Sequence, residues 1–107
     1  MPQADFAAHL TADRRLVLLR VLLESAGYAA NEYLLQSMAE RLGHVASGDR
    51  IRSDLAWLAE QELIALDTVA DVQIATLLGR GEDVAKGRTE VPGIKRPQPQ
   101  RFKSGGA

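Results

Sequence analysis

The spacing of the apolar residues changes once along the chain, near Ile64, and this change limits the folds open to it. Before Ile64, large apolar side chains recur at the spacing of one helix face. After it they alternate with polar ones, and β-branched residues flank the short turn Ala70-Asp71, as in a two-stranded hairpin. The pattern therefore predicts an α+β fold in which helices precede a hairpin near residues 64–78.

Three helices are expected before the hairpin, over residues 12–26, 31–42 and 48–62. Thr11, Asn31 and Ser47 are the expected N-caps, because their side-chain oxygens can accept hydrogen bonds from the first helical turn. The first helix is so apolar that it should be the central helix of the core. The expected core residues are Leu16, Leu19, Leu23, Leu35, Met38, Leu42, Ile51, Leu55 and Leu58.

This order of elements is that of a winged helix, a helix-turn-helix core with a two-stranded β-hairpin wing, here expected over residues 10–86. Residues 87–107 are rich in Gly, Pro and Lys/Arg, and we expect a largely disordered basic tail there. Residues 1–79 carry six arginines and eleven carboxylates, whereas residues 80–107 carry seven Lys/Arg and three carboxylates. Phosphate-binding charge is therefore concentrated in the tail.

Enzyme chemistry is not expected from this sequence. It has no cysteine, its two histidines lie far apart, and neither has a nucleophile at a known spacing. Gly79-Arg80-Gly81 lacks the lysine and hydroxyl residue of a phosphate-binding loop. We expect no cofactor and no metal. No long apolar stretch or leader-like segment stands out, so a cytoplasmic location away from membranes is expected.

Several motifs resemble one family over nearly the whole chain. They are Asp13-Arg14-Arg15-Leu16-Val17, Gly43-His44, Asp54-Leu55-Ala56-Trp57-Leu58-Ala59-Glu60-Gln61 and Val91-Pro92-Gly93-Ile94-Lys95-Arg96-Pro97. The chain resembles the small winged-helix proteins of Mu-like prophages that are commonly labelled ArsR-like transcriptional regulators. In winged-helix regulators a glycine often begins the exit from the third helix, and Glu62 occupies that place here. The resemblance implies a DNA-binding regulator.

The third helix is then the candidate recognition helix, since such helices read base edges with their N-terminal residues. Arginine contacts to guanine and tail contacts to phosphates complete the expected site. The expected DNA-contacting residues are Arg50, Arg52, Ser53, Lys95 and Arg96. Two features oppose this hypothesis: the wing tip carries Asp67 and Asp71, and the turn before the third helix is longer than the standard one. An ordinary solvated helix face with internal ion pairs is the alternative.

Other residues allow a structural or a functional interpretation. Trp57 is expected in core packing or a dimer contact, and His44 in a turn hydrogen bond or a phosphate contact. Val91 and Ile94 could dock on a second subunit. The first hypothesis is a homodimeric regulator that binds double-stranded DNA. The alternative is a protein-interaction winged helix in phage assembly or DNA packaging. The operator, any effector and the oligomeric state stay open.

Overall fold

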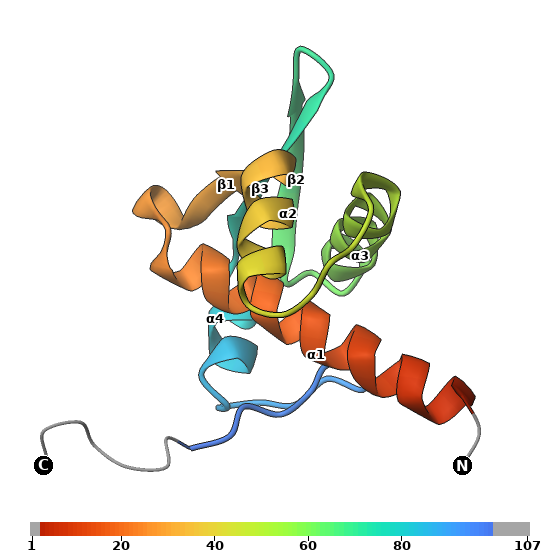
Figure 1. Ribbon diagram of the computed structural model, residues 1–107. Coiled ribbons are helices and arrows are strands. Elements are labelled where there is room, and N and C mark those ends of the chain that lie inside the picture. Colours follow the sequence, from red (N-terminus) through yellow and green to blue (C-terminus); the bar gives the residue numbers. More distant parts are fainter. Residues whose placement is uncertain (1–2, 100–107) are drawn as a thin grey trace, which may run out of the picture.

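The computed structural model describes residues 3–99, and within them the chain is α+β, with helices packed around a three-stranded antiparallel sheet (Figure 1). The elements in chain order are α1 (Gln3–Glu24), the short 3-10 helix η1 (Ala26–Tyr28), β1 (Ala29–Asn31), α2 (Glu32–Arg41), α3 (Gly48–Glu60), β2 (Ile64–Val69), β3 (Val72–Leu77) and α4 (Gly79–Ala85). None of these helices is long and apolar enough to cross a membrane. The three predicted helices and the predicted hairpin are thereby confirmed as elements.

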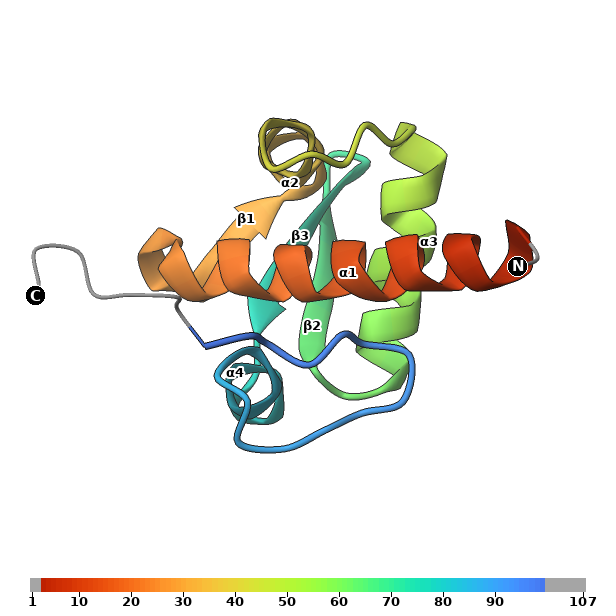
Figure 2. The ribbon, with the colours of Figure 1, turned by 60° about the horizontal axis from the view of Figure 1, so that its bottom comes forward.

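Helix α1 begins well before the predicted start at residue 12, so Thr11 lies inside the helix and the predicted cap is wrong. Residues 3–10 contain three alanines and neither Gly nor Pro, so nothing interrupts helix propagation. The helix ends at Glu24, and Gly27 adopts a φ of 65° in the turn that follows. In Figure 2 the first turns of α1 project beyond the rest of the fold.

The predicted caps of α2 and α3 are confirmed. The Asn31 side chain accepts a hydrogen bond from the Leu34 N–H at 2.8 Å, and the Ser47 hydroxyl accepts one from the Arg50 N–H at 3.0 Å. Beyond the end of α3, Glu62 adopts a φ of 61°, the left-handed conformation that usually favours glycine.

The sheet has the strand order β1-β3-β2, and both pairings are antiparallel. Ala70 and Asp71 form a two-residue turn with φ angles of 50° and 67°, which is the type I′ geometry. Strand β1 was not predicted, because three residues are too few to establish an alternating pattern. Its Ala30 lies opposite Ala75 of β3 and is buried.

The core lies between α1, α2, α3 and the sheet. Most of the predicted core residues are buried, namely Leu16, Leu19, Leu35, Ile51, Leu55 and Leu58. Leu23 and Met38 are half-buried. Leu42 is 55% exposed, so its predicted burial is wrong. It lies just past the last residue of α2 and faces outward beside α1.

The C-terminal segment, defined here as residues 87–99, packs against α1 and α4, so the predicted disorder is wrong for its central part. Val91 is buried, and Ile94 packs against the same core. The Lys95 N–H donates to the Ala12 carbonyl oxygen at 3.1 Å. Figure 2 shows the segment running alongside α1. Val91 and Ile94 thus dock on their own chain, and the predicted tail beyond residue 99 lies outside the described residues.

Candidate functional site

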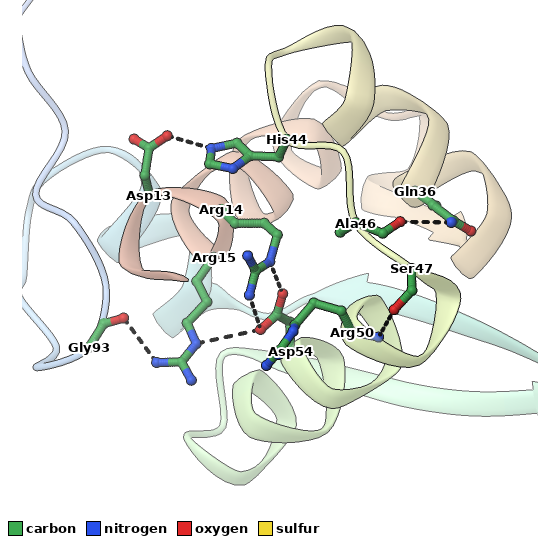
Figure 3. Close-up of polar contacts among 10 residues, drawn as sticks. All are labelled: Asp13, Arg14, Arg15, Gln36, His44, Ala46, Ser47, Arg50, Asp54 and Gly93. Carbon is green, nitrogen blue, oxygen red and sulfur yellow. Dashed lines mark hydrogen bonds and ion pairs between the residues drawn. The ribbon is translucent and has the colours of Figure 1, made fainter. Parts of the chain in front are cut away.

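A buried ion pair fixes α3 against α1. The guanidinium of Arg14 donates to the carboxylate of Asp54 through Nε and also through Nη2, the latter at 3.2 Å, and both side chains are buried (Figure 3). The two side chains meet between the helices, where each neutralises the charge of the other.

Arg15 joins α1, α3 and the C-terminal segment. Its guanidinium lies 3.8 Å from the centroid of the Trp57 ring, a cation–π distance, and its Nη1 donates to the Gly93 carbonyl oxygen at 3.1 Å. Trp57 therefore packs within the chain, in line with the first of its two expected roles. Its half-buried ring supports the position of the C-terminal segment.

His44 is buried and its Nε2 lies 2.6 Å from the Asp13 carboxylate (Figure 3). Lys95 approaches the other carboxylate oxygen of Asp13 at 3.3 Å. Burial on its own would raise the pKa of Asp13, but the hydrogen bonds from His44 and Lys95 outweigh burial, and the pKa is lowered. His44 thus anchors the turn between α2 and α3 to α1 by a long-range contact, where a local hydrogen bond of the turn was expected.

The exposed side of α3 is tied to the wing, which is the hairpin of β2 and β3, through Arg52. Its Nε and Nη2 donate to the two carboxylate oxygens of Glu32, each at 2.7 Å, and Nη2 also donates to the Asp71 carbonyl oxygen at 2.9 Å. Glu32 accepts a further hydrogen bond from the Gln73 N–H at 2.7 Å. The hydrogen bonds from Arg52 and then from Gln73 lower the pKa of Glu32 to about 2. One ion pair therefore joins α2, α3 and the wing.

The surface formed by the start of α3 and the tip of the wing, here named the α3–wing face, is predominantly acidic. Its exposed residues include Asp49, Arg50, Arg52, Ser53, Asp67, Val69 and Asp71. Within residues 3–99, Arg50 forms no ion pair, while the charge of the neighbouring Arg52 is neutralised by Glu32. The face therefore offers one uncommitted cation among three carboxylates.

The predicted site residues fall into two groups. Arg50, Arg52 and Ser53 lie together near the start of α3. Lys95 and Arg96 lie in the C-terminal segment, where they pair with Asp13 and Glu90 respectively. Figures 1 and 2 both place this segment at the opposite end of the fold from the start of α3. Among the described residues, the two groups therefore do not form one continuous basic surface.

Sequence reasoning missed the partners that hold these arginines. Glu32 lies 20 residues before Arg52, and Asp54 lies 40 residues after Arg14, so no local spacing signals either pair. The one usable signal was the presence of a carboxylate in the first turn of α2, where the helix dipole favours it. Within the described part of the chain, no group of three His, Cys, Asp or Glu side chains could hold a metal ion.

A second surface lies between α1 and α2. A groove of about 530 Å³ is lined mainly by apolar side chains. The lining residues are Val17, Arg20, Val21, Glu24, Ser25, Leu34, Met38 and Leu42. Leu34 and Leu42 are both exposed. We refer to this feature as the α1–α2 groove.

Comparison with known proteins defines the family. The chain is 45% identical over 91 residues to the uncharacterized protein gp26 of Escherichia phage Mu, covering 85% of this chain and 94% of that protein. It is also 44% identical over 67 residues to an uncharacterized protein of Haemophilus influenzae, covering 63% of this chain and 65% of that protein. No protein-family model and no solved structure matches the chain.

These relationships establish a Mu-like phage protein with an α+β fold. The chain belongs to the family of phage Mu gp26.

Proposed function

We propose that this phage protein is a winged-helix interaction module that binds another phage protein during assembly or DNA packaging. The winged-helix assignment is supported by the order of the elements: α2 and α3 form a helix–turn–helix pair, and the β2–β3 hairpin follows α3 directly. The additional strand β1 pairs with β3 at the edge of this hairpin.

The observation that carries the proposal is the ion pair of Glu32 and Arg52 beside an acidic wing. A wing that contacts duplex DNA normally presents Lys or Arg to the phosphates. Here the tip presents Asp71. The guanidinium of the neighbouring Arg52 is hydrogen-bonded through both Nε and Nη2 to the carboxylate of Glu32. Phosphate contacts supply most of the affinity in non-specific DNA binding, and uncommitted cations are needed to make them. The α3–wing face is poorly equipped for that task.

The same charges suit a protein partner. The face exposes the carboxylates of Asp49, Asp67 and Asp71 together with the apolar side chain of Val69. A partner with basic residues around an apolar depression would be complementary in both respects, since matched charges steer association and a central apolar contact gives affinity.

Binding of double-stranded DNA by a homodimeric regulator is the second candidate function, and one observation favours it. Arg50 and Ser53 are exposed near the start of α3, where recognition helices read base edges. Arg50 could therefore reach a guanine. In this candidate function Arg52 would have to leave Glu32 before it could contact DNA.

Site-specific photo-crosslinking distinguishes the two functions at one position. A photoreactive residue replaces Ser53 in a protein produced during phage growth, with the same replacement at exposed Thr89 as the control. The proposal predicts an adduct with a phage-encoded protein at position 53 only, and loss of that adduct when Asp71→Lys is added. An adduct with DNA at position 53, or no protein adduct specific to that position, would contradict it.

A further inference from the structure

The start of α1 carries apolar side chains that the fold leaves uncovered. All residues from Asp5 to Leu10 are exposed, including Phe6 at 66% and Leu10 at 42%. We call residues 3–10 the arm, because these helical turns project beyond the body of the fold (Figure 2). An exposed phenylalanine and leucine on one projecting helix are typical of an interaction site.

The arm and the α1–α2 groove belong to the same face of α1. At 100° per residue, Phe6, Leu10, Val17 and Val21 fall within an arc of about 60°. Val17 and Val21 form the α1 wall of the groove. One stripe of a single helix therefore has two halves: the first half projects freely, and the second half lines an open apolar groove.

The surface around this stripe holds most of the exposed apolar side chains of the described residues. Leu34 and Leu42 line the other wall of the groove, and Val45, which follows His44 in the turn bound to Asp13, is 82% exposed. Together with Phe6 and Leu10, they make up five of the nine large apolar residues that are exposed. Within residues 3–99, no segment of the chain covers them.

We propose that a second copy of this chain covers this face, with the two α1 helices antiparallel and each arm seated on the α1–α2 groove of the other copy. The spacing along α1 fits a two-fold axis. Phe6 and Val21 have the same midpoint in sequence as Leu10 and Val17, between Asp13 and Arg14. A two-fold axis at this midpoint therefore places Phe6 opposite Val21 and Leu10 opposite Val17 at once, as a self-complementary interface requires.

The turn near the axis fits the same arrangement. His44 is hydrogen-bonded to Asp13, so exposed Val45 lies close to the midpoint of the stripe. In the dimer the two copies of Val45 would lie near each other across the axis. The interface uses α1, α2 and the turn between α2 and α3, so it leaves the α3–wing face free for the partner of the proposed function.

Variants that introduce a charge on either side of the arm–groove contact test this contact. The full-length protein is expected to sediment as a dimer at micromolar concentrations. Phe6→Glu places a charge in the apolar contact, and Leu42→Arg does so in the groove, so each should raise the dimer dissociation constant at least about tenfold. Both side chains are exposed in the monomer, so the helical circular dichroism and the Tm of the monomer should change little.

Mixing the two variants is the decisive step. The mixed dimer has one unaltered arm–groove contact, and in the other contact the introduced glutamate faces the introduced arginine. The mixture should therefore dimerise more tightly than either variant alone. A monomeric full-length protein at about 100 µM, well above the micromolar range of a functional dimer, or a dimer unaffected by either substitution, would overturn the proposal.

Disulfide formation adds an independent geometric test. The chain has no cysteine, so Val45→Cys introduces one thiol near the proposed axis. Mild oxidation should give a covalent dimer of Val45→Cys, and it should give much less with Val69→Cys at the wing tip, which is also exposed. Equal yields for the two variants would contradict the arrangement. Neither outcome depends on whether the α3–wing face binds protein or DNA.

Discussion

Arg52 and Glu32 form a two-point ion pair, Nε to Oε1 and Nη2 to Oε2 at 2.7 Å each, between α3 and the first turn of α2. The pair joins the helix that would read DNA to the base of the wing, because Glu32 also accepts the Gln73 N–H and Arg52 also donates to the Asp71 carbonyl oxygen. It orients the wing relative to α3 and neutralises the arginine that a DNA reader would use.

The acid stability of the fold should depend on this pair. The pKa of Glu32 is lowered from 4.5 to about 2 in the folded protein, so its contribution is fully present above pH 4.5. As the pH falls from 4.5 to 2, protonation progressively removes that contribution. The difference in unfolding free energy between the natural protein and Glu32→Gln should therefore shrink over this range.

Urea denaturation at pH 7, 4 and 2.5 measures the effect. Glu60→Gln is the matched control, because Glu60 is exposed and forms no ion pair within residues 3–99. A difference between the natural protein and Glu32→Gln that stayed constant across the three pH values would show that the pair does not contribute as inferred.

Removing one partner of the Arg14–Asp54 pair should destabilise the fold strongly. Asp54→Ala leaves the buried guanidinium of Arg14 without its partner, and losing one side of a buried pair costs about 3–5 kcal/mol. Asp49→Ala, at an exposed position in the first turn of the same helix, should change the free energy of unfolding by no more than about 1 kcal/mol. If the two variants melted alike in urea, the ion pair would have no structural role.

The wing turn contains a residue that strains its backbone. Ala70 has a φ of 50°, a left-handed conformation that costs a residue with a Cβ about 1 kcal/mol and costs glycine little. Ala70→Gly should therefore raise the free energy of unfolding by about 1 kcal/mol. Ala65→Gly, at an exposed position within β2, should lower it instead. A loss of stability in Ala70→Gly would argue against the type I′ turn.

Helix α4 approaches the exit of α3 so closely that only glycine fits at position 81. A Cβ there would lie 2.2 Å from the Leu63 carbonyl oxygen and 2.8 Å from a methyl carbon of Leu77. Gly81→Ala should therefore cost roughly 2 kcal/mol or more, since backbone must shift to relieve the overlap. Gly79→Ala is the control, because a Cβ at that position meets nothing within 4 Å. Equal thermal melts for the two variants would contradict this packing.

The sequence predicted the features that depend on neighbouring residues. The caps Asn31 and Ser47 are local hydrogen bonds, and the hairpin follows from alternation over the residues of its own strands. The start of α1 was misplaced because Thr11 resembles an N-cap, although residues 3–10 contain no residue that breaks a helix. Strand β1 was missed because it is only 3 residues long.

The remaining errors concern contacts between distant segments. The composition of residues 87–107 predicts disorder, yet Val91 and Ile94 pack against the core, and Gly93 and Lys95 are hydrogen-bonded to α1. Likewise, the arginines of the candidate site could be located from the sequence, but their ion-pair partners could not be predicted. Whether Arg52 is free or bound depends on Glu32, which lies on another helix.

The affinity of the full-length protein for random-sequence duplex DNA, measured at several salt concentrations, tests the central claim most directly. No saturable binding is expected even at low salt, because Arg52, Lys95 and Arg96 are each paired with a carboxylate. The contrary result would be tight binding that weakens with salt. For each tenfold rise in salt concentration, the logarithm of the association constant would then fall by about 0.9 for each phosphate contact. If Arg50→Ala then weakened that binding, and deletion of residues 91–107 reduced the slope, this protein would be a DNA reader and not a protein-interaction module.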